Sequence, residues 1–525
     1  MVAELSLFAI LLFLVFFARK QRHRRRQLPP SPMALPIIGH LHLLGPLIHH
    51  SFRDISSRYG PLIYLRLGSV SAVVASTPEL AKQLLKTHEF TFSSRKHSIA
   101  IDRLTYNSSF AFASYGPYWK FIKKISTFEL LGNRMINQFL PIRKQELHRF
   151  LGVFYSKSKA GESVNITQEL IKLSNNIISQ MMLSMRSSSS DGEAETVITV
   201  VREVTQIFGE FNISDVIWFC KNIDFQGVRK RVEDIYFKYD GLLEKLITSR
   251  EELRKKNRSN GVVHEARDFL DIMLDVMEDE NAEIKLTRNH IKALFLDFFT
   301  AATDTTAITI EWALAELINQ PRILEKAREE INSVVGNGRI IQESDNSNLP
   351  YIQAILKETF RLHPPIPMIA RKSIQDCKIN GYTIPANTLL FVNMWSIGRD
   401  PKYWRNPSQF QPERFLQSCN EDDDVTSSID IRGQHFQLLP FGAGRRSCPG
   451  ISLAMQALPT TLAAMIQCFD WKVVNQPEGQ INGDDDHLLL DMTERPGLTA
   501  PRIHELVCTP VPRLPSDVLD PVCGN

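Results

Sequence analysis

A single cysteine, Cys448, lies in a ten-residue loop of unusual composition, F-G-A-G-R-R-S-C-P-G over positions 441–450. Gly442 and Gly444 allow backbone turns that other residues avoid, and two arginines precede the cysteine. An apolar helix is predicted over 451–468, opened by the proline after Cys448. The cysteine therefore precedes a helix N-terminus, where free N–H groups and the helix dipole favour a thiolate. No partner Cys or His lies at the spacing of a zinc site, so a single thiolate here is suitable as an axial haem ligand. The alternative interpretation is a buried free cysteine.

Two polar residues, Asp304 and Thr305, interrupt an otherwise apolar stretch. The segment Asn289–Asn319 contains no proline or glycine and is followed by Pro321, so the pattern predicts one long helix. Because it is apolar nearly all round, this helix should be central. A buried aspartate needs partners or a raised pKa, and a threonine hydroxyl can bond the carbonyl four residues back. The pair is either a proton relay or polar packing against a neighbouring helix.

A helix predicted after Gly116 and Pro117 carries Trp119 and Lys123 four residues apart. Side chains at this spacing point the same way. An indole N–H and an ammonium on one face can hold a carboxylate such as a haem propionate, although the pair alone is weak evidence. The preceding loop, His97–Tyr115, has little periodicity and is either a substrate-facing segment or an ordinary surface loop.

The helix predicted from Pro350 to His363 contains Glu358 and Arg361 in an E-x-x-R spacing. The spacing alone means little, because three other pairs share it and are expected to be exposed ion pairs. These are Glu146/Arg149, Glu251/Arg254 and Glu325/Arg328. The distinguishing feature of the fourth pair is its place in the chain, ahead of the P-E-R-F sequence at 412–415.

The composition is that of a chain able to bury a large core, with 525 residues of which 43% are apolar and 23% charged. Seven cysteines without paired spacing argue against a disulfide framework and for a reducing compartment. The net charge is only +3, and six lysines and arginines lie between Arg19 and Arg26. Nothing in this distribution indicates nucleic acid binding, because the positive charge belongs to the N-terminus.

The N-terminal 18 residues are apolar from Leu5 to Ala18 apart from Ser6. This run is short for a membrane span but sufficient with snorkelling flanks. Basic residues follow it and no small-residue cleavage site intervenes, so residues 1–18 are predicted to be a signal-anchor transmembrane helix rather than a cleaved signal peptide. The positive-inside rule then leaves the body of the chain cytosolic. Residues 19–40 form a basic and Pro-rich hinge.

The frame F-x-x-G-x-R-x-C-x-G within 441–450 resembles the haem-binding signature of the cytochrome P-450 superfamily. The resemblance covers about 28–513, with its landmarks in order. It implies the cytochrome P-450 fold, mainly α-helical with a small β-rich region. A haem-thiolate catalytic domain over 41–513 and a flexible C-terminal tail over 514–525 are expected. Haem b, O2 and NADPH are also implied, with electrons arriving through NADPH-cytochrome P-450 reductase.

The resemblance also implies site residues. Thr305 would lie beside the dioxygen-binding position, with Asp304 behind it feeding protons through water, and Cys448 would ligate the iron. The residues implied for haem binding are Trp119, Lys123, Arg371, Phe441, Gly442, Gly444, Arg446, Cys448 and Gly450. The residues implied for the substrate pocket are Phe298, Ala301, Ala302, Ile366, Ile369, Ala370 and Leu498. A buried structural network is implied for Glu358, Arg361 and Arg414.

Two positions depart from the family pattern. Lys123 stands where the family has arginine, which keeps the charge but loses the bidentate fork. Ala302 stands where the family usually has glycine, so an extra methyl group would crowd the pocket. The reductase is expected to dock on a basic face that includes Lys120, Lys124 and Arg445.

Wider stretches are similar to the plant flavone synthase II group, namely 104–109, 208–212, 299–307 and 435–441. That similarity implies oxidation of flavanones such as naringenin to flavones such as apigenin, at the endoplasmic reticulum membrane. Flavanone 2-hydroxylation and isoflavone synthesis by aryl migration remain alternatives within the same chemistry. An O2-independent haem-thiolate isomerase and a non-enzymatic haem-binding protein are alternatives of other classes, and neither needs a relay at Asp304 and Thr305.

Overall fold

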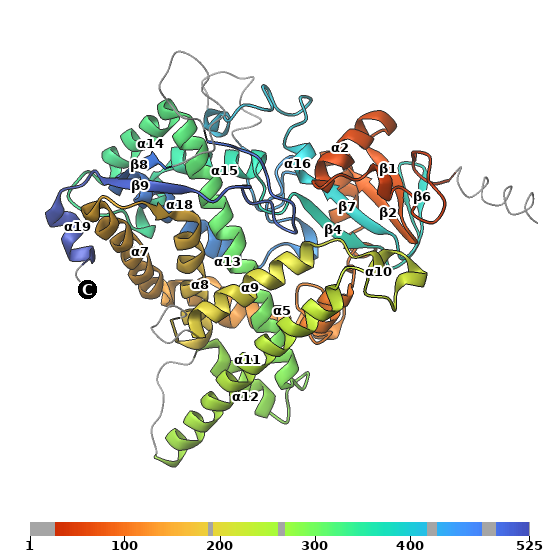
Figure 1. The fold of residues 1–525 in the computed structure, drawn as a ribbon, viewed down its shortest axis with the longest axis horizontal. Coiled ribbons are helices and arrows are strands. Elements are labelled where there is room, and N and C mark those ends of the chain that lie inside the picture. Colours follow the sequence, from red (N-terminus) through yellow and green to blue (C-terminus); the bar gives the residue numbers. More distant parts are fainter. Residues whose placement is uncertain (1–26, 187–192, 261–267, 417–427, 475–489, 524–525) are drawn as a thin grey trace, which may run out of the picture.

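The computed structural model describes residues 27–186, 193–260, 268–416, 428–474 and 490–523. The described chain is mainly helical (Figure 1). The helices of eight or more residues are α2 (Ile48–Tyr59), α5 (Pro117–Ser126), α7 (Leu140–Ala160), α8 (Ile166–Leu183), α9 (Glu193–Gly209), α11 (Val228–Ser259), α12 (Phe269–Glu278), α13 (Arg288–Asn319), α14 (Pro321–Val334), α15 (Pro350–Leu362), α18 (Ile451–Cys468) and α19 (Ser516–Cys523). The shorter helices are α3 (Pro78–Lys82), α4 (Ile99–Leu104), α6 (Asn133–Gln138), α10 (Ile213–Val216) and α16 (Met394–Ile397).

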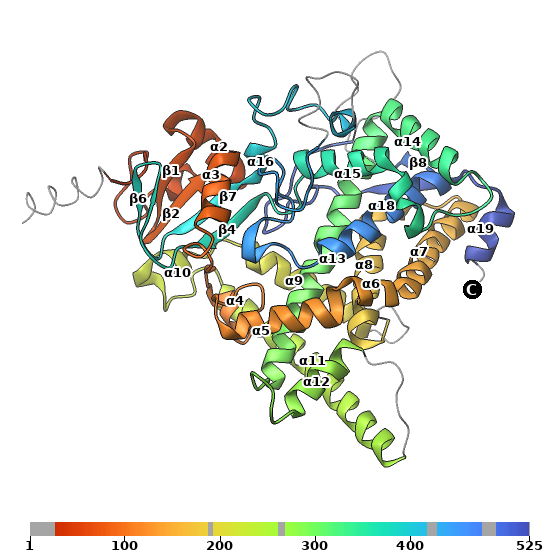
Figure 2. The same ribbon diagram turned by 180° about the vertical axis from the view of Figure 1, so that it is seen from behind.

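Helix α13 is the central element of the fold. It runs through the molecule in both views, packed along α8 and against α9, α15 and α18 (Figures 1 and 2). Thr287 caps its N-terminus together with His290, and Pro321 begins the next helix instead of continuing this one. The predicted long central helix is therefore confirmed.

A four-stranded sheet lies at the end of the molecule away from α14 and α19 (Figure 1). Its order is β1 (Leu62–Leu67), β2 (Val70–Ala75), β7 (Leu389–Asn393), β4 (Met368–Lys372), and only the β2–β7 pair is parallel. β1 and β2 form an antiparallel hairpin that turns at Gly68, pairing from Leu62–Ala75 to Leu67–Val70. Two smaller sheets join β5 (Cys377–Ile379) to β6 (Tyr382–Ile384), and β3 (Val164–Asn165) to β9 (Val507–Pro512) and β8 (Phe469–Val473).

The Pro-rich segment is fastened to the sheet rather than hanging free. The Thr383 amide donates to Gln27 O at 2.6 Å, and the Tyr64 amide donates to Pro30 O at 2.9 Å. Gly39 makes bridges to Leu35 and Leu67. The described part of the predicted hinge therefore joins the body of the protein as an ordered edge.

The C-terminal tail was expected to be flexible, and this is wrong for most of its length. Helix α19 packs against α7, because Leu519 is fully buried in the main hydrophobic core. The exposed Asp520 also pairs with Lys159 of α7 at 3.0 Å. An apolar helix face that finds a partner is ordered whatever its position in the chain.

The predicted membrane anchor, residues 1–18, lies outside the described residues. Among the described helices, α13 and α18 are long and apolar enough to cross a membrane by length and composition. In both helices most of the apolar stretch is buried inside the protein, as expected for core helices.

Candidate active site

The loop around Cys448 folds as its glycines predict. Gly442 and Gly444 have φ of 69° and 70°, and a Cβ at Gly444 would lie 2.4 Å from the carbonyl oxygen of Leu85. The Cys448 amide donates to Phe441 O at 2.8 Å, which closes the loop on itself. Helix α18 begins only at Ile451, so the proline after Cys448 lies in the turn before the helix and not in its first turn.

The thiol of Cys448 is accessible, whereas the other four cysteines whose side chains are described are buried. Although the thiol is accessible, the protein atoms close to the sulfur desolvate it and raise the pKa of the Cys448 thiol. The Gly450 amide acts in the opposite direction. A Cβ at Gly450 would lie 3.8 Å from the sulfur. An accessible sulfur in a closed loop fits metal ligation, with the metal displacing the proton.

Three arginines converge beside this loop. Arg371 on β4 is buried and donates to Arg446 O at 3.1 Å, and Arg446 in turn donates to Ser93 O at 3.0 Å. Burial and the neighbouring arginines hold the pKa of Arg371 well below its usual range. Burial, with Arg95 beside it, lowers the pKa of Arg446 to about 9. Burial also lowers the pKa of Arg95 to about 10, against an opposing effect of Asp297.

The arginine cluster provides a test of whether a haem fits here. Buried cations without matching carboxylates are costly, and the buried Arg95 Nε has no hydrogen-bond partner. Two carboxylates such as the haem propionates would supply the missing charge and acceptors. The donor set, one thiolate with buried guanidiniums at its edge, therefore fits a haem. Arg95 was not predicted, because its sequence neighbourhood carries no local signal.

Trp119 and Lys123 lie together on α5, as their spacing predicts. The Lys123 ammonium lies 5.1 Å from the Trp119 ring and donates to Arg445 O at 2.8 Å. Burial, aided by Arg446 and Arg445, lowers the pKa of Lys123. Arg446 also stacks on Trp119 at 4.4 Å. In this structure Lys123 therefore ties α5 to the cysteine loop, and a role at a propionate stays a prediction.

Apart from its two ends, helix α13 is accessible only over residues 300–306, where the relay was predicted. Its residues 291–299 and 307–317 are buried, whereas Ala301 is exposed and Ala302, Asp304 and Thr305 are partly exposed. The Thr305 hydroxyl donates to Ala301 O at 2.6 Å. Burial raises the pKa of Asp304, while a hydrogen bond from Thr205 and the charges of Arg202 and Arg495 oppose it. The partner on α9 was not predicted, since it requires two distant helices to meet.

The residues predicted for the substrate pocket come from several segments, and their role stays a prediction. Phe298 lies on α13, while the exposed Ile366 and Leu498 come from two other segments. Leu498 approaches α9 closely, since a Cβ at Gly209 would lie 2.1 Å from the Leu498 amide. On β4, Ala370 is partly exposed, but Ile369 lies on the other face with Arg371 and is buried. Ile369 therefore faces the cysteine loop, because its Cδ1 would be 3.8 Å from a Cβ at Gly442.

A second carboxylate on the same helix was missed. Asp297 is buried and accepts hydrogen bonds from Ser109 Oγ at 2.7 Å and from the Phe110 amide at 2.6 Å. Burial raises its pKa to about 7, although these bonds and Arg95 oppose the shift. Asp297 lies seven residues before Asp304, which is two helical turns along the same face. A second acidic residue in an apolar helix is the sequence feature that could have identified it.

Glu358, Arg361 and Arg414 come together in one buried network. Arg361 donates to both carboxylate oxygens of Glu358 at 2.7 Å, and Arg414 Nε donates to one of them at 3.0 Å. The remaining donors of Arg361 reach the carbonyls of Gly398, Pro407 and Gln409.

The other E-x-x-R pairs were expected at the surface, and for Glu146 this is wrong. Glu146 is 1% exposed and accepts hydrogen bonds from Arg149 and Asn176, among others. Burial of the Glu146 carboxylate depends on α8, which packs against α7, and that contact is invisible in the local sequence. Glu325 and Arg328 are the pair that matches the expectation, 3.4 Å apart with Glu325 exposed.

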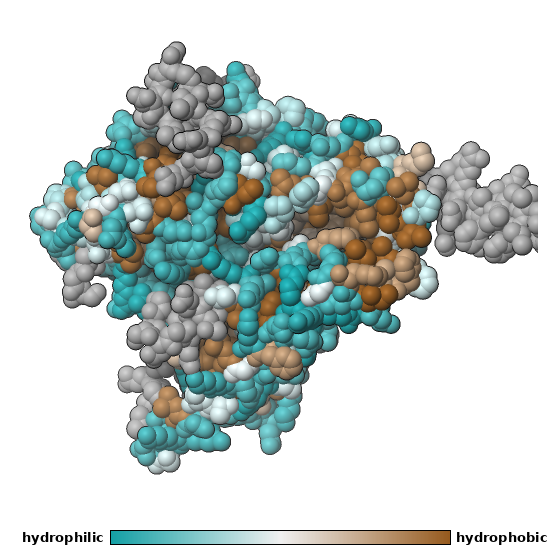
Figure 3. Space-filling view, in the orientation of Figure 1, coloured by the Kyte–Doolittle hydropathy of each residue, from teal (hydrophilic) through white to brown (hydrophobic). Residues whose placement is uncertain are grey.

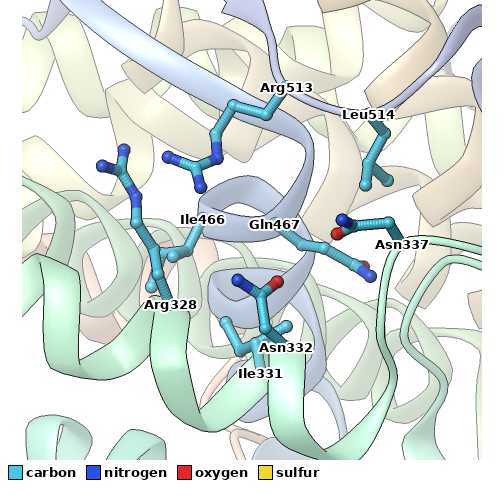
Figure 4. Close-up of a pocket in the computed structure, with 8 residues that line it drawn as sticks. All are labelled: Arg328, Ile331, Asn332, Asn337, Ile466, Gln467, Arg513 and Leu514. Atoms are coloured by element: carbon cyan, nitrogen blue, oxygen red, sulfur yellow. The ribbon is translucent and has the colours of Figure 1, made fainter.

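A separate pocket of about 90 Å³ lies between α14, α18 and the end of β9. Figure 4 shows Arg328, Arg513 and Gln467 among its lining side chains. None of the predicted catalytic, haem-binding or substrate residues lines this pocket. Two of its arginines pair with Asp470, so this pocket is distinct from the candidate active site.

Comparisons with known proteins identify the family of the chain. The family model described as Cytochrome P450 matches residues 29–495. Cytochrome P450 93B16 of Glycine max is 57% identical over 96% of this chain and 95% of its own length, and Cytochrome P450 93B2 of Gerbera hybrida is 58% identical over 97% and 96%. The 2-hydroxyisoflavanone synthase of Glycyrrhiza echinata is 48% identical, covering 94% of each chain.

Among solved structures, a zebrafish cytochrome P450 determined with progesterone aligns over 90% of this chain and 100% of its own. The TM-score is 0.71 and the identity 28%, which confirms the predicted fold class. The chain therefore belongs to the cytochrome P450 family, as a haem-thiolate monooxygenase of the plant group numbered 93.

Proposed function

We propose that the chain is a flavone synthase of type II, which removes two hydrogen atoms across C2–C3 of a flavanone such as naringenin to give a flavone such as apigenin. One flavanone, O2, NADPH and a proton yield one flavone, two waters and NADP+. The observation that carries the proposal is a group of paired aromatic rings, one of them on α13 next to its accessible part. Flat aromatic substrates are bound well between ring faces and edges.

These aromatic rings come from segments that are far apart in the chain. The rings of Phe110 and Phe298 lie 6.4 Å apart, and Phe112 meets Phe208 edge to face at 5.7 Å. Three of the four stretches that are similar to flavone synthases, 104–109, 208–212 and 299–307, contribute to these segments or adjoin them. The shared stretches therefore concern the substrate side of the protein.

Membership of the family brings haem, O2 and electrons from NADPH through NADPH-cytochrome P450 reductase. A haem bound by Cys448 supplies the oxidising chemistry, activating O2 and removing hydrogen from the substrate. The chain's own polar groups handle the protons. Asp304, whose pKa is raised by burial, holds a proton to higher pH than an exposed aspartate. Thr305 presents its hydroxyl beside the accessible backbone of Ala301.

A second candidate is the reaction for which the relatives called 2-hydroxyisoflavanone synthase are named. Those of Glycyrrhiza echinata and Glycyrrhiza uralensis are 48% identical to this chain. That reaction would keep the same haem and the same relay but add a hydroxyl group and move the aryl ring. Flavanone 2-hydroxylation without migration would likewise keep both. These outcomes differ in how the substrate is oriented above the iron, so the products distinguish them.

The reductase is proposed to dock on the outer face of α5 and the cysteine loop. Lys120 and Lys124 are exposed there, and the Arg445 side chain is half exposed. Glu89 pairs with Arg445 at 2.9 Å and reduces the positive charge of this face in part. Complementary charge would steer an acidic partner toward the proximal side of the haem.

Attachment to the endoplasmic reticulum membrane is proposed through residues 1–18 and an apolar surface. Figure 3 shows brown residues gathered at the end of the molecule that carries β1, β2 and α10. Exposed large side chains there include Met33, Ile37, Trp218 and Phe225. The turn between β1 and β2 joins the two segments, since the Gly68 amide donates to Ile38 O and the Ser69 amide to Val216 O. An apolar patch of this kind is typical of a membrane contact.

The test uses microsomes that contain the full chain and a plant reductase, supplied with naringenin, NADPH and 18O2. A type II flavone synthase should release apigenin without 18O, because both oxygen atoms leave as water. Cys448→Ala microsomes are the control for background oxidation. Labelled 2-hydroxynaringenin or a labelled 2-hydroxyisoflavanone as the main product would overturn the proposal in favour of the corresponding alternative.

A further inference from the structure

Two adjacent histidines and one glutamate meet at a point that the reaction does not use. His49 and His50 belong to α2, whereas Glu494 begins the hairpin that carries Leu498. His49 and Glu494 are buried, at 4% and 7% exposed. In the part of the chain that the structure describes, this is the group of histidine, cysteine and carboxylate side chains whose potential ligand atoms all lie within 4.8 Å of one another.

The distances are close to those of a metal site. His49 Nε2 lies 2.6 Å from Glu494 Oε2, and His50 Nε2 lies 3.3 Å from the same oxygen. Ligand bonds of about 2.0–2.1 Å in a tetrahedral zinc site place neighbouring ligand atoms roughly 3.3 Å apart. The second separation already matches, and the first needs to widen by about 0.7 Å. The ring planes of the two histidines are nearly perpendicular, at 84°.

One ligand atom is unused in the structure. His50 Nε2 is buried but makes no hydrogen bond, although it lies 3.3 Å from a carboxylate oxygen of Glu494. A buried polar atom without a partner is costly unless something binds it. The His50 side chain as a whole is 36% exposed, so this buried nitrogen lies close to the protein surface.

The surrounding side chains hold the three ligands in place. Trp395 Nε1 donates to Glu494 Oε1 at 2.8 Å and leaves Oε2 to face the histidines. The Trp395 ring packs against the His50 ring with centroids 4.0 Å apart. Asn393 donates to His49 O at 2.7 Å, which fixes the backbone of α2 at this point. Support of this kind, behind the ligands, is a regular feature of protein metal sites.

We propose that His49, His50 and Glu494 bind one divalent transition-metal ion, with zinc as the expected occupant and water as the fourth ligand. Two imidazoles and a carboxylate are a ligand set that zinc accepts with one open position. None of the three residues belongs to the predicted catalytic, haem-binding or substrate set, and the proposed oxidation uses none of them. The metal would join α2 to the hairpin that Glu494 begins. That hairpin is closed by the β-bridge between Glu494 and Arg502, and the Ala500 amide donates to Pro365 O.

The experiment uses the haem-loaded full chain in detergent, stripped with a chelator and dialysed against micromolar Zn2+. Wild type should retain one zinc per chain, and its thermal midpoint should rise with added Zn2+. His50→Ala should lose both effects. His42→Ala, an exposed histidine of the same region, is the matched control and should behave as wild type. Trp395→Phe should weaken binding about 10–100-fold, as expected for loss of a group that orients a ligand.

Zinc X-ray absorption gives a readout independent of enzyme activity and should show two imidazole nitrogens and oxygen around the metal. Each variant is first checked for the thiolate-type carbonyl spectrum, so loss of folding is not mistaken for loss of a ligand. Equal zinc content in wild type and His50→Ala would overturn the proposal. So would a wild type without stoichiometric zinc, which would leave a purely hydrogen-bonded contact between α2 and the hairpin.

Discussion

Replacement of Glu358 by glutamine should destabilise the protein far more than the same change at Glu325, although both lie in an E-x-x-R spacing on a helix. The Glu358 carboxylate is fully buried and accepts four hydrogen bonds, two from Arg361, one from Arg414 and one from the Gln411 amide. Glutamine offers one acceptor oxygen, and its NH2 group would meet a guanidinium N–H. Two buried cations would also lose their counter-charge.

The expected magnitude follows from the burial. Breaking a buried ion pair by removing one partner costs about 3–5 kcal/mol. An unfolding entropy of roughly 2 cal/mol/K per residue, over the length of this chain, converts that to a fall of about 3–5 °C in thermal midpoint. Glu325 is 60% exposed and 3.4 Å from Arg328. An exposed pair contributes at most about 1 kcal/mol, so Glu325→Gln should shift the midpoint by no more than about 1 °C.

The assay is heating at one fixed scan rate, followed by the thiolate-type Soret band of the reduced carbonyl complex. The fixed rate matters because unfolding of a large haem protein is rarely reversible. Midpoints of wild type, Glu358→Gln and Glu325→Gln are compared in the same detergent. If Glu358→Gln and Glu325→Gln had the same midpoint, the buried network would not stabilise the haem region and the reasoning from burial would be refuted.

Four further predictions concern the site. Cys448→Ala should abolish the thiolate-type carbonyl band, and a retained band would remove Cys448 as the ligand. Thr305→Ala should keep haem and substrate binding but lower flavone formed per NADPH consumed, by up to about 10²–10⁴-fold if the hydroxyl acts in general acid catalysis; an unchanged ratio would contradict a relay. Reduction by the reductase should slow as ionic strength rises, over the roughly 10 Å screening length at 0.1 M, and Lys120→Ala with Lys124→Ala should flatten that dependence. Burial raises the pKa of Asp297 to about 7. Between about pH 4 and pH 7 the folded protein therefore keeps this proton, whereas the unfolded chain loses it. Its stabilising contribution is present below pH 4 and is lost as pH rises through 7, at about 1.4 kcal/mol per pH unit. Asp297→Asn should therefore gain stability relative to wild type between pH 5 and pH 8 in urea unfolding, and parallel pH curves would contradict the shift.

Local sequence determined the features that depend on neighbouring residues. The left-handed turns at Gly442 and Gly444, the long helix α13 and the hairpin of β1 and β2 all follow from backbone preference and hydrophobic periodicity over short stretches. A cysteine at the end of such a loop was recognisable as a ligand for the same reason.

Contacts between distant segments were beyond the reach of those patterns. Arg95 joins the arginines beside the Cys448 loop from a segment with no motif of its own. Glu146 is buried because α8 covers it, and the C-terminal helix is ordered because Leu519 finds the core. In each case the free energy comes from burial against a partner whose position only the assembled fold defines.

The sequence by itself determined the family, the turns of the loop that carries Cys448 and the central helix with its polar pair, since each is written in a contiguous stretch of chain. Only the tertiary structure decided which charges become buried together. His49 and Glu494 are 445 positions apart and Asp304 meets Thr205 of another helix, so their chemistry arises from packing that no local pattern contains. Burial then changes the pKa values of such groups and leaves polar atoms such as His50 Nε2 without partners. Desolvation depends on the atoms that surround a group in the folded protein, and not on its neighbours in sequence.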